Sequence, residues 1–291
     1  MKRILTLTLV LMILSVCNAQ AAVPFKVKLW QDGAPTKNGY EGVPEEWNGA
    51  RAMKVSDPEL WIYPAKNPTG QCVVFSPGGG YRQLSTENEG TSFVNWFNTQ
   101  GITLAVLKYR LPNGHSGVPI EDGRRAMQIM RSLADDFKIN PDEIGIMGGS
   151  AGGHFAATLS TMYGDPQYRP DFQILLYPVI TMGDVTHKGS RKHLLGDKPS
   201  KEEIEKFSLE NRVDAQTPPA FIVLGADDQI VDPLNSIFYS ISLQKNHVPY
   251  SLHIYPEGFH GFGWQDIMPY KAEWGMELSR WLRDLHAEKK K

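Results

Sequence analysis

The stretch Ile144–His154, which reads IGIMGGSAGGH, decides the fold of this 291-residue chain. Its first half is apolar and has the length of a buried strand, and Phe155–Met162 after it can form a helix. Between them stands Gly-x-Ser-x-Gly, centred on Ser150, in the strand–turn–helix setting in which this motif presents a nucleophile. Gly148 and Gly152 let the crowded turn bend and let strand and helix pack closely. We therefore expect the serine hydroxyl at the carboxyl end of a strand, although a glycine-rich turn with an incidental serine shares this pattern.

A serine hydroxyl becomes a strong nucleophile only when a base takes its proton and an acid orients that base. The sequence offers the acid as Asp227 or Asp228, just after the apolar strand Phe221–Gly225. It offers the base as His260, in the loop after the alternating strand Ser251–Tyr255. All three groups therefore follow strand ends on one rim of a parallel sheet. The chain order serine, aspartate, histidine is that of α/β-hydrolases and differs from the orders of chymotrypsin-like and subtilisin-like enzymes.

A glycine-rich segment, Pro77–Tyr81 (PGGGY), follows the apolar strand Cys72–Phe75. Ester cleavage places negative charge on the former carbonyl oxygen, and preorganised backbone N–H groups stabilise that charge. We expect one donor at Ala151, directly after the serine. The other is expected at Gly79 or Gly80, in the loop that reads His-Gly-Gly-Gly in lipases and esterases. Proline replaces that histidine here, but the three glycines remain.

Motifs along almost the whole chain together resemble one family. They are PGGGY at 77–81, TENEG at 86–90, LKYRL at 107–111, GGSAGGH at 148–154, DF at 171–172, LYPV at 176–179, PP at 218–219 and HGFG at 260–263. From about Leu29 to Leu285 the chain resembles the BD-FAE-type α/β-hydrolase esterases, which include acetyl xylan esterases and are often found near xylan- and pectin-degrading enzymes. The resemblance implies the α/β-hydrolase fold and serine esterase chemistry without a cofactor.

The same resemblance selects between the two candidate acids. In that family the acid lies in an Asp-x-x-Val segment after the penultimate core strand. This register selects Asp228, with Val231 three residues later, over Asp227. Many members continue with proline after the valine, whereas an aspartate intervenes here. The resemblance thus implies a triad of Ser150, Asp228 and His260.

Apolar strands alternate with amphipathic segments in the rest of the chain. Further strands are expected at 59–63, 102–107 and 172–176, and helices at 90–100, 119–137, 233–245 and 270–285. This alternation predicts a mostly parallel central sheet with helices on both faces, in one catalytic domain over residues 22–291. The interval between the strands at 172–176 and 221–225 is expected to carry a short polar cap. Its basic middle, Asp184–His193, is either a solvated loop or a rim that contacts an acidic or hydroxyl-rich substrate.

Three further side chains have two readings each. Trp264 either stacks on a sugar face or packs in the interior. Glu87 and Glu89 either position the glycine-rich segment or lie exposed, and neither is assigned a catalytic role. His154, at the start of the helix after the serine, is expected to make a structural hydrogen bond.

Composition limits the partners that the chain is expected to bind. With 41% hydrophobic residues and a net charge of −2, the chain has the composition of a soluble globular protein. Its one basic run, Lys289–Lys291, is expected to be a solvated tail, so no nucleic-acid partner is expected. His154, His187 and His193 lack the cysteine pair, His-Glu-x-x-His motif or carboxylate set that a metal site would need, so no metal is expected.

The amino-terminal segment is typical of an exported protein. Two cationic residues precede the apolar run Ile4–Val16, and alanines follow at 19, 21 and 22. This arrangement predicts a signal peptide over residues 1–21, whose apolar core is too short to span a membrane, and a secreted or periplasmic protein. Lipidation at Cys17 is the alternative. Cleavage leaves Cys72 as a single cysteine, which cannot form an internal disulfide.

Together these observations predict a serine esterase for short-chain acyl esters, acetyl esters above all. Acetylated xylan or pectic oligosaccharides are the expected substrates, because of the resemblance and the predicted export. Feruloyl esterase, formamidase or peptidase activity on the same groups is the first alternative. A glycan-binding protein without catalysis is an alternative of another class, but the intact serine, acid, histidine and glycine-rich loop argue against it.

Overall fold

The structure, a computed structural model, describes residues 23–289. The signal peptide predicted for residues 1–21 and the alternative lipidation at Cys17 lie outside the described residues. Within residues 23–289, no helix combines the length and the apolar composition needed to cross a membrane.

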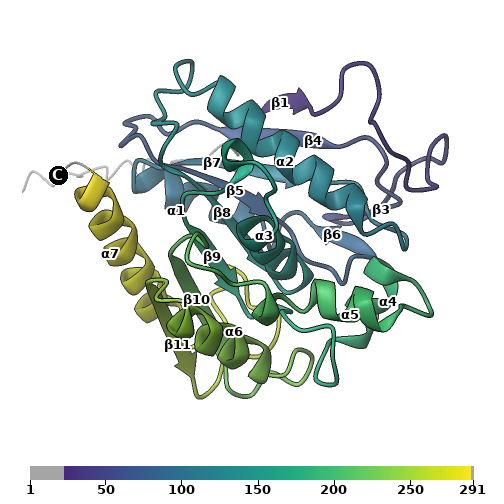
Figure 1. Cartoon of the computed structure of the whole chain (residues 1–291). Coiled ribbons are helices and arrows are strands. Elements are labelled where there is room, and N and C mark those ends of the chain that lie inside the picture. Colours follow the sequence, from purple (N-terminus) through teal and green to yellow (C-terminus); the bar gives the residue numbers. More distant parts are fainter. Residues whose placement is uncertain (1–22, 290–291) are drawn as a thin grey trace, which may run out of the picture.

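An eight-stranded sheet in the order β1-β4-β7-β5-β8-β9-β10-β11 runs through the centre of the molecule (Figure 1). Its strands are β1 (Phe25–Lys28), β4 (Glu59–Tyr63), β5 (Cys72–Ser76), β7 (Thr103–Lys108), β8 (Ile144–Gly149), β9 (Gln173–Leu176), β10 (Ala220–Gly225) and β11 (Tyr250–Tyr255). The six strands from β7 to β11 in this order pair in parallel, and β4 and β1 add an antiparallel edge. All residues of β5, β7, β8, β9 and β10 are buried, as strands covered on both faces require. The predicted mostly parallel sheet is confirmed.

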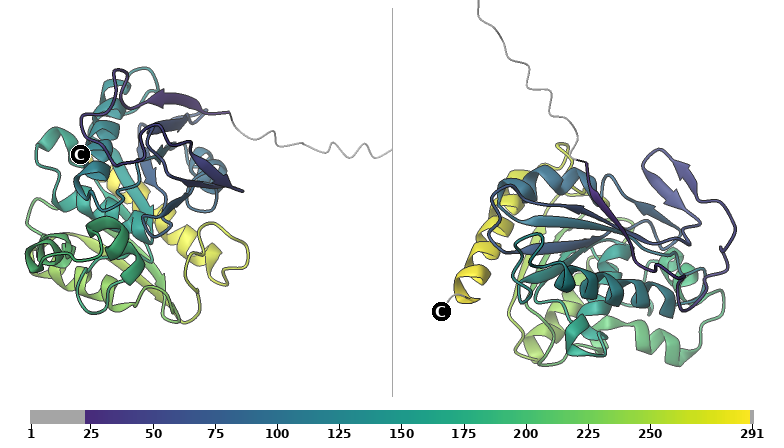
Figure 2. Two further views of the ribbon diagram at one scale, coloured as in Figure 1. Left: turned by 90° about the vertical axis from the view of Figure 1, so that its right-hand side faces the viewer. Right: turned by 90° about the horizontal axis from the view of Figure 1, so that it is seen from above.

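Helices cover both faces of this sheet, as predicted. They are α1 (Val94–Thr99), α2 (Gly117–Ser132), α3 (Ala151–Thr161), α6 (Leu234–Lys245) and α7 (Lys271–Lys289). Figure 2 shows α1 and α7 on one face and α2, α3 and α6 on the other. The carboxyl ends of the parallel strands therefore remain open along one rim, where loops carry the candidate site residues.

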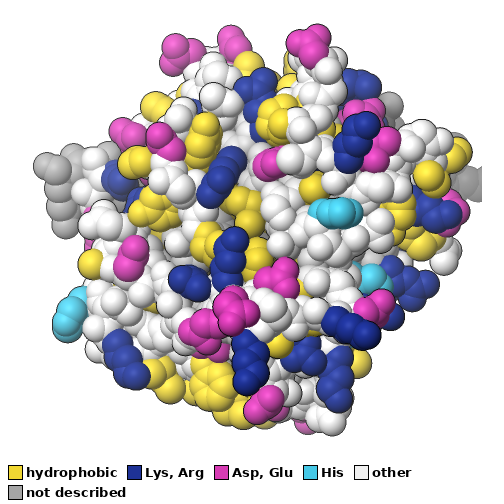
Figure 3. All heavy atoms as spheres, turned by 45° about the vertical axis from the view of Figure 1, so that its right-hand side comes forward, with side chains coloured by type: hydrophobic (Ala, Val, Ile, Leu, Met, Phe, Trp, Pro, Cys, Tyr) yellow, Lys and Arg dark blue, Asp and Glu magenta, His cyan; other side chains and the backbone are white. Residues whose placement is uncertain are grey.

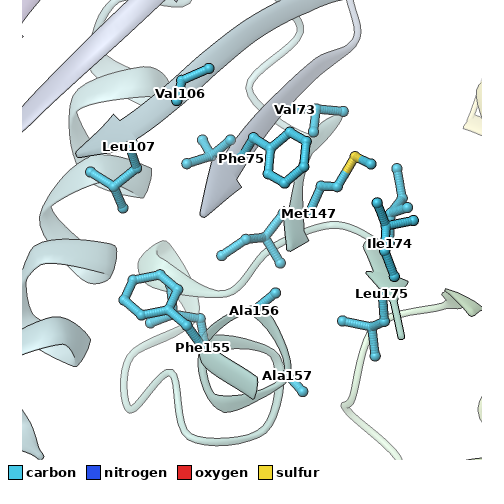
Figure 4. Packing of buried hydrophobic residues seen from close by; sticks show 14 of the residues in the cluster. Val73, Phe75, Val106, Leu107, Met147, Phe155, Ala156, Ala157, Ile174 and Leu175 are labelled. Atoms are coloured by element: carbon cyan, nitrogen blue, oxygen red, sulfur yellow. The ribbon is translucent and has the colours of Figure 1, made fainter. Parts of the chain in front are cut away.

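The core lies on both faces of the central strands. Phe75 of β5, Met147 of β8 and Ile174 of β9 are paired in register and completely buried on the face towards α1 and α7, where Phe75 packs against Phe93 (Figure 4). Ala156 and Ala157 of α3 are completely buried against the opposite face, and their small side chains let the helix lie close to β8 and β9 (Figure 4). Each large apolar side chain buried in this way stabilises the fold by about 1.5–3 kcal/mol. This packing fixes the turn between β8 and α3.

A small second sheet and a helical cap flank the rim. The strands β2 (Glu46–Asn48), β3 (Arg51–Met53) and β6 (Gln83–Ser85) form an antiparallel sheet that the sequence analysis did not predict. Between β9 and β10 lie α4 (Lys188–Leu195), α5 (Lys201–Phe207) and a 3-10 turn at Leu209–Asn211. A further 3-10 turn at Pro166–Tyr168 precedes β9.

Three element boundaries differ from the predictions. The helix expected at 119–137 ends at Ser132, and turns follow up to Lys138, whose φ is +54°. The helix expected at 90–100 begins with a 3-10 turn at Thr91–Phe93. The predicted loop at 184–193 is wrong from Lys188 onward, because the side chain of His187 accepts the Ser190 amide and starts α4 there.

Candidate active site

The turn at Ser150 has the strained geometry expected of an exposed nucleophile. Ser150 directly follows β8 and has φ +55° and ψ −122°, a backbone conformation that residues other than glycine rarely adopt. Its amide donates to the carbonyl of Leu176 at 3.0 Å, which holds the turn against the neighbouring strand. A Cβ atom at Gly148 would collide with the carbonyl of Gly152, and one at Gly152 would collide with the carbonyl of Ser76. Glycine is therefore required sterically at both motif positions.

The structure brings Ser150, His260 and Asp228 together at the ends of β8, β11 and β10. Nε2 of His260 lies 2.8 Å from Oγ of Ser150, and Nδ1 lies 2.7 Å from Oδ2 of Asp228. The Asp228 side chain is 1% exposed, whereas that of His260 is 15% exposed. With Nδ1 donating to the carboxylate, Nε2 is free to accept the serine proton. The arrangement therefore has the geometry of a charge-stabilised general base beside a nucleophile.

The two neighbouring aspartates make different contacts. Oδ1 of Asp228 accepts from the amides two and three residues later, at 2.9 and 3.0 Å, which turns Oδ2 towards His260. Oδ1 of Asp227 instead accepts from the amides of Gly258 and Phe259, at 2.8 and 3.0 Å. Asp227 thus anchors the loop that carries the histidine, and Asp228 contacts the histidine itself.

The glycine-rich loop lies beside the serine. Gly79 and Gly80 have φ of +122° and +66°, and both line the same hollow as Ser150. The amide of Gly78 is already used, because it donates to Glu89 at 2.6 Å. Within residues 23–289, no protein group accepts the amide hydrogens of Gly79, Gly80 or Ala151. These three N–H groups therefore remain available to a ligand.

Glu89 is a buried residue whose position the sequence left open. Its second carboxylate oxygen accepts the hydroxyl of Tyr177 at 3.1 Å, and that hydroxyl accepts the amide of Gly263 at 3.0 Å. The Tyr177 ring also packs edge-on against His260, with centroids 5.0 Å apart. Burial raises the pKa of Glu89, while the nearby His260 and its hydrogen bonds act in the opposite direction. Glu89 therefore links the glycine-rich loop to the loop of the histidine, and the TENEG motif was its only signal.

The hollow at the site is large and is lined mostly by polar residues. Its volume is about 900 Å³, and it extends from the serine between the small sheet and the cap. The side chains that line it include those of Asn48, Arg51, Arg82, Gln83, Glu87 and Asn88. Of the two glutamates left open by the sequence, Glu87 is exposed here and Glu89 is buried.

The cap contributes two histidines to the hollow, His187 and His193. Nδ1 of His187 accepts the amide of Ser190 at 3.2 Å, so the neutral ring carries its proton on Nε2. Burial lowers the pKa of His187, and the neighbouring His260 and His193 lower it further. His187 is therefore a neutral hydrogen-bond donor, and these contacts support the substrate-rim reading of Asp184–His193.

Two other candidate residues have structural contacts. Trp264 packs against Trp274 with ring centroids 4.9 Å apart and does not line the hollow. His154 is completely buried, with Nδ1 2.9 Å from the Tyr81 hydroxyl and Nε2 2.9 Å from the carbonyl of Phe207. Burial lowers the pKa of His154 to about 4. Across the described part of the chain, no three His, Cys, Asp or Glu side chains are grouped as metal ligands would be.

Comparisons with known proteins agree with this architecture. An acetylxylan esterase of Xylanibacter ruminicola is 36% identical over 99% of this chain, which spans 56% of that relative's length. The crystal structure of an acetyl ester-xyloside bifunctional hydrolase from Caldicellulosiruptor lactoaceticus has a TM-score of 0.76 and 31% identity, covering 92% of this chain and 98% of that one. An alpha/beta hydrolase enzyme from a Medee basin deep-sea metagenome library shares the fold, with a TM-score of 0.62 and 22% identity over 87% of this chain and 97% of that one. The model of the BD-FAE family matches residues 60–243, and the chain belongs to the BD-FAE family of α/β-hydrolases.

Proposed function

We propose that this protein is a serine esterase that removes acetyl groups from carbohydrates, with acetylated xylan or pectic oligosaccharides as its substrates. The proposal rests on the hydrogen bonds that join Asp228 to His260 and His260 to Ser150. Ser150 and His260 open onto a hollow lined mostly by polar residues. The likeness to proteins named as an acetylxylan esterase and an acetyl ester-xyloside hydrolase supports an acetylated sugar as the substrate.

In the proposed reaction, Oγ of Ser150 attacks the ester carbonyl while Nε2 of His260 takes its proton. Asp228 accepts the N–H at Nδ1 and stabilises the imidazolium that forms. The amide of Ala151, with that of Gly79 or Gly80, stabilises the negative charge on the former carbonyl oxygen.

The second half of the reaction uses the same groups. His260 returns the proton to the sugar oxygen as the bond between acyl carbon and that oxygen breaks, which leaves an acetylated serine. Water then attacks this ester while Nε2 takes one of its protons. Collapse of the second intermediate returns the proton to Oγ of Ser150 and releases acetate.

The lining of the hollow supports a short acyl group. Among the described residues that line it, Ile230 has the one large apolar side chain. The cap contributes histidine and glycine rather than an apolar cover. On the face shown in Figure 3, apolar side chains occur in small groups among charged and polar ones. Since each buried methylene contributes about 0.8 kcal/mol, a long acyl chain would gain little here.

The proposal includes export of the protein. Removal of residues 1–21 would leave the catalytic domain, residues 22–291, outside the cytoplasm, where polymeric glycans are found. The charged and apolar amino-terminal pattern supports this location.

Acetate release from acetylated xylo- and pectic oligosaccharides by the purified mature chain tests the proposal. Separate assays with p-nitrophenyl acetate, butyrate and octanoate measure the acyl preference, and Ser150→Ala provides the inactive control. We expect acetate to be preferred over butyrate, octanoate to be nearly inert, and the oligosaccharides to exceed the artificial acetate in kcat/KM. A preference for octanoate or emulsified triglyceride would refute the carbohydrate substrate, and a preference for methyl ferulate would favour a feruloyl esterase.

A further inference from the structure

We propose that the preferred substrate is an acetylated oligosaccharide that also carries a uronic-acid carboxylate, which Arg51 and Arg82 bind. This inference rests on the proposed esterase function and names the chemistry of the sugar portion. The hollow supports it first by its size. At about 900 Å³ it is far larger than an acetyl group needs, so sugar units and their substituents enter it together with the ester.

The side chains of these two arginines differ from those of most other described arginines because they make no hydrogen bond or ion pair within residues 23–289. Arg110, for example, pairs with Asp122 at 2.8 Å, and Arg131 pairs with Asp171 at 3.1 Å. In the described part of the chain, only Arg51, Arg82 and Arg283 lack both a side-chain hydrogen bond and an ion pair. Two of these three line the hollow. Their guanidinium groups are exposed and have donors available for a ligand.

The two carboxylates of the hollow differ in how far they are exposed beside these arginines. Of the two glutamates in its lining, Glu89 is 4% exposed and accepts the amide of Gly78 and the hydroxyl of Tyr177. Glu87 is the one exposed glutamate in the lining of the hollow, which also contains the two exposed arginines. The formal charges of the two arginines and the two glutamates cancel, but the exposed charges are those of Arg51, Arg82 and Glu87, so an anionic ligand in the hollow meets two exposed cations and one exposed anion.

The backbones of both arginines lie close to the glycine-rich loop. The amide of Arg82 donates to the carbonyl of Gly79 at 3.2 Å, so this residue is joined to the glycine-rich loop. Arg51 in β3 pairs in register with Ser85 in β6, which follows the same loop. A carboxylate held by these residues would belong to the sugar that bears the ester or to a neighbouring one.

The chemistry of the donors points to a carboxylate on a sugar. A planar guanidinium binds a carboxylate through two parallel hydrogen bonds, which a neutral hydroxyl cannot match. Asn48, Gln83 and Asn88 line the same hollow and supply the uncharged donors and acceptors that sugar hydroxyls need. Acidic side groups of xylan and the galacturonate units of pectin share this carboxylate, so the substrates of the test have to separate them.

The experiment compares acetate release from matched pairs of acetylated oligosaccharides at low and high salt. One pair is xylo-oligosaccharides with and without a glucuronic-acid branch. The other is galacturonan oligosaccharides with free or methyl-esterified carboxyl groups. We expect the acidic member to have roughly tenfold higher kcat/KM in about 20 mM NaCl, mainly through KM. About 0.5 M NaCl shortens the screening length from roughly 20 Å to roughly 4 Å and should remove most of this preference.

Variants assign the preference to the arginines. Arg51→Gln and Arg82→Gln should each lower the ratio of acidic to neutral kcat/KM severalfold, and Arg82→Lys should restore it only in part. The ratio is taken within each variant, so a general loss of activity does not affect it. Arg283→Gln, at an exposed arginine on α7 outside this hollow, should leave the ratio unchanged.

The outcomes separate the two proposals. Equal kcat/KM for acidic and neutral members in both pairs, or a preference that both glutamine variants retain, overturns the carboxylate site and leaves the esterase function standing. Hydrolysis of p-nitrophenyl acetate without acetate release from any oligosaccharide overturns the proposed carbohydrate function, and the carboxylate site with it. A preference in one pair alone supports the site and identifies the source of the uronate.

Discussion

Replacing Asp228 by asparagine is expected to leave His260 in the wrong tautomer. Oδ1 of Asp228 accepts two backbone amides at 2.9 and 3.0 Å, and asparagine keeps both bonds only if its own oxygen takes that position. Its NH₂ group then faces Nδ1 of His260, where Oδ2 now lies at 2.7 Å. An NH₂ group donates, so Nδ1 has to accept and the ring proton moves to Nε2. Nε2 faces Ser150 and would then be unable to take the serine proton.

The expected loss is about 10⁴-fold in kcat, the size found when the acid of such a triad becomes an amide. This factor corresponds to about 5.4 kcal/mol of lost transition-state stabilisation, at 1.36 kcal/mol for each tenfold. Initial rates with p-nitrophenyl acetate measure kcat, and thermal unfolding shows whether the variant remains folded. Because the asparagine oxygen keeps the two amide bonds, we expect the melting temperature to change little.

Asp227→Asn is the matched control. Its oxygen can still accept the amides of Gly258 and Phe259, now bound at 2.8 and 3.0 Å, so the loop of the histidine stays in place. We expect kcat to fall less than about tenfold, since losing the charge weakens bonds that an uncharged oxygen still makes. A larger loss in Asp227→Asn than in Asp228→Asn, or about 1% or more of wild-type kcat in Asp228→Asn, would refute the assignment of the acid.

Three further predictions concern the nucleophile, its turn and acid stability. Ser150→Ala should lower ester turnover by at least about 10⁴-fold in a folded protein, and a serine-directed phosphonate should label only the wild type. Gly152→Ala should destabilise the fold by at least about 1 kcal/mol and reduce activity, because its Cβ would collide with the carbonyl of Ser76; unchanged unfolding and kcat would contradict the turn geometry. Burial lowers the pKa of His154 from 6.5 to about 4, so below pH 6.5 the unfolded state binds more protons and the free energy of unfolding falls as the pH falls. Urea titrations at pH 7 and pH 4 measure the free energy of unfolding at each pH. Between these pH values His154 should account for a loss of about 3 kcal/mol in the wild type, and His154→Gln should lack this contribution.

The sequence predicts the inner strands of the central sheet well because they are buried on both faces, whereas the largely exposed edge strand β1 was not predicted. All six residues of β7 and of β10 are buried, and each strand stands out as a continuous apolar run between polar segments. The small sheet gives no such signal. Each of its strands has three residues, and all three residues of β2 are exposed, so there is no periodicity to detect. That sheet nevertheless forms one side of the hollow.

The acid of the triad could not be identified from the local sequence alone. Asp227 and Asp228 are adjacent, follow the same strand and have the same charge, so composition and strand position cannot separate them. Only the register of the family motif favours Asp228. The structure gives the physical difference, because consecutive side chains in a turn point in different directions and only one of them faces the histidine.

The cap shows how a tertiary contact can override a local pattern. Its segment Lys188–Leu195 is polar and basic, which favours a solvated loop. In the structure His187 accepts the Ser190 amide, and Leu194 and Leu195 are buried, so capping and packing stabilise a helix there. The same helix start places the proton of neutral His187 on Nε2, and His187 lines the hollow. One residue thus both starts the helix and lines the hollow.

Glu89 could not have been assigned from the sequence, because its role depends on residues far apart in the chain. It accepts the Gly78 amide directly and reaches the Gly263 amide through the Tyr177 hydroxyl. Without Glu89 the Gly78 amide and the Tyr177 hydroxyl would be buried donors without an acceptor, at a cost of about 1–3 kcal/mol each. The glycine-rich loop and the histidine loop are therefore held by one carboxylate. The groups proposed to stabilise the oxyanion and to move the proton are positioned relative to each other by a residue that takes no part in either step.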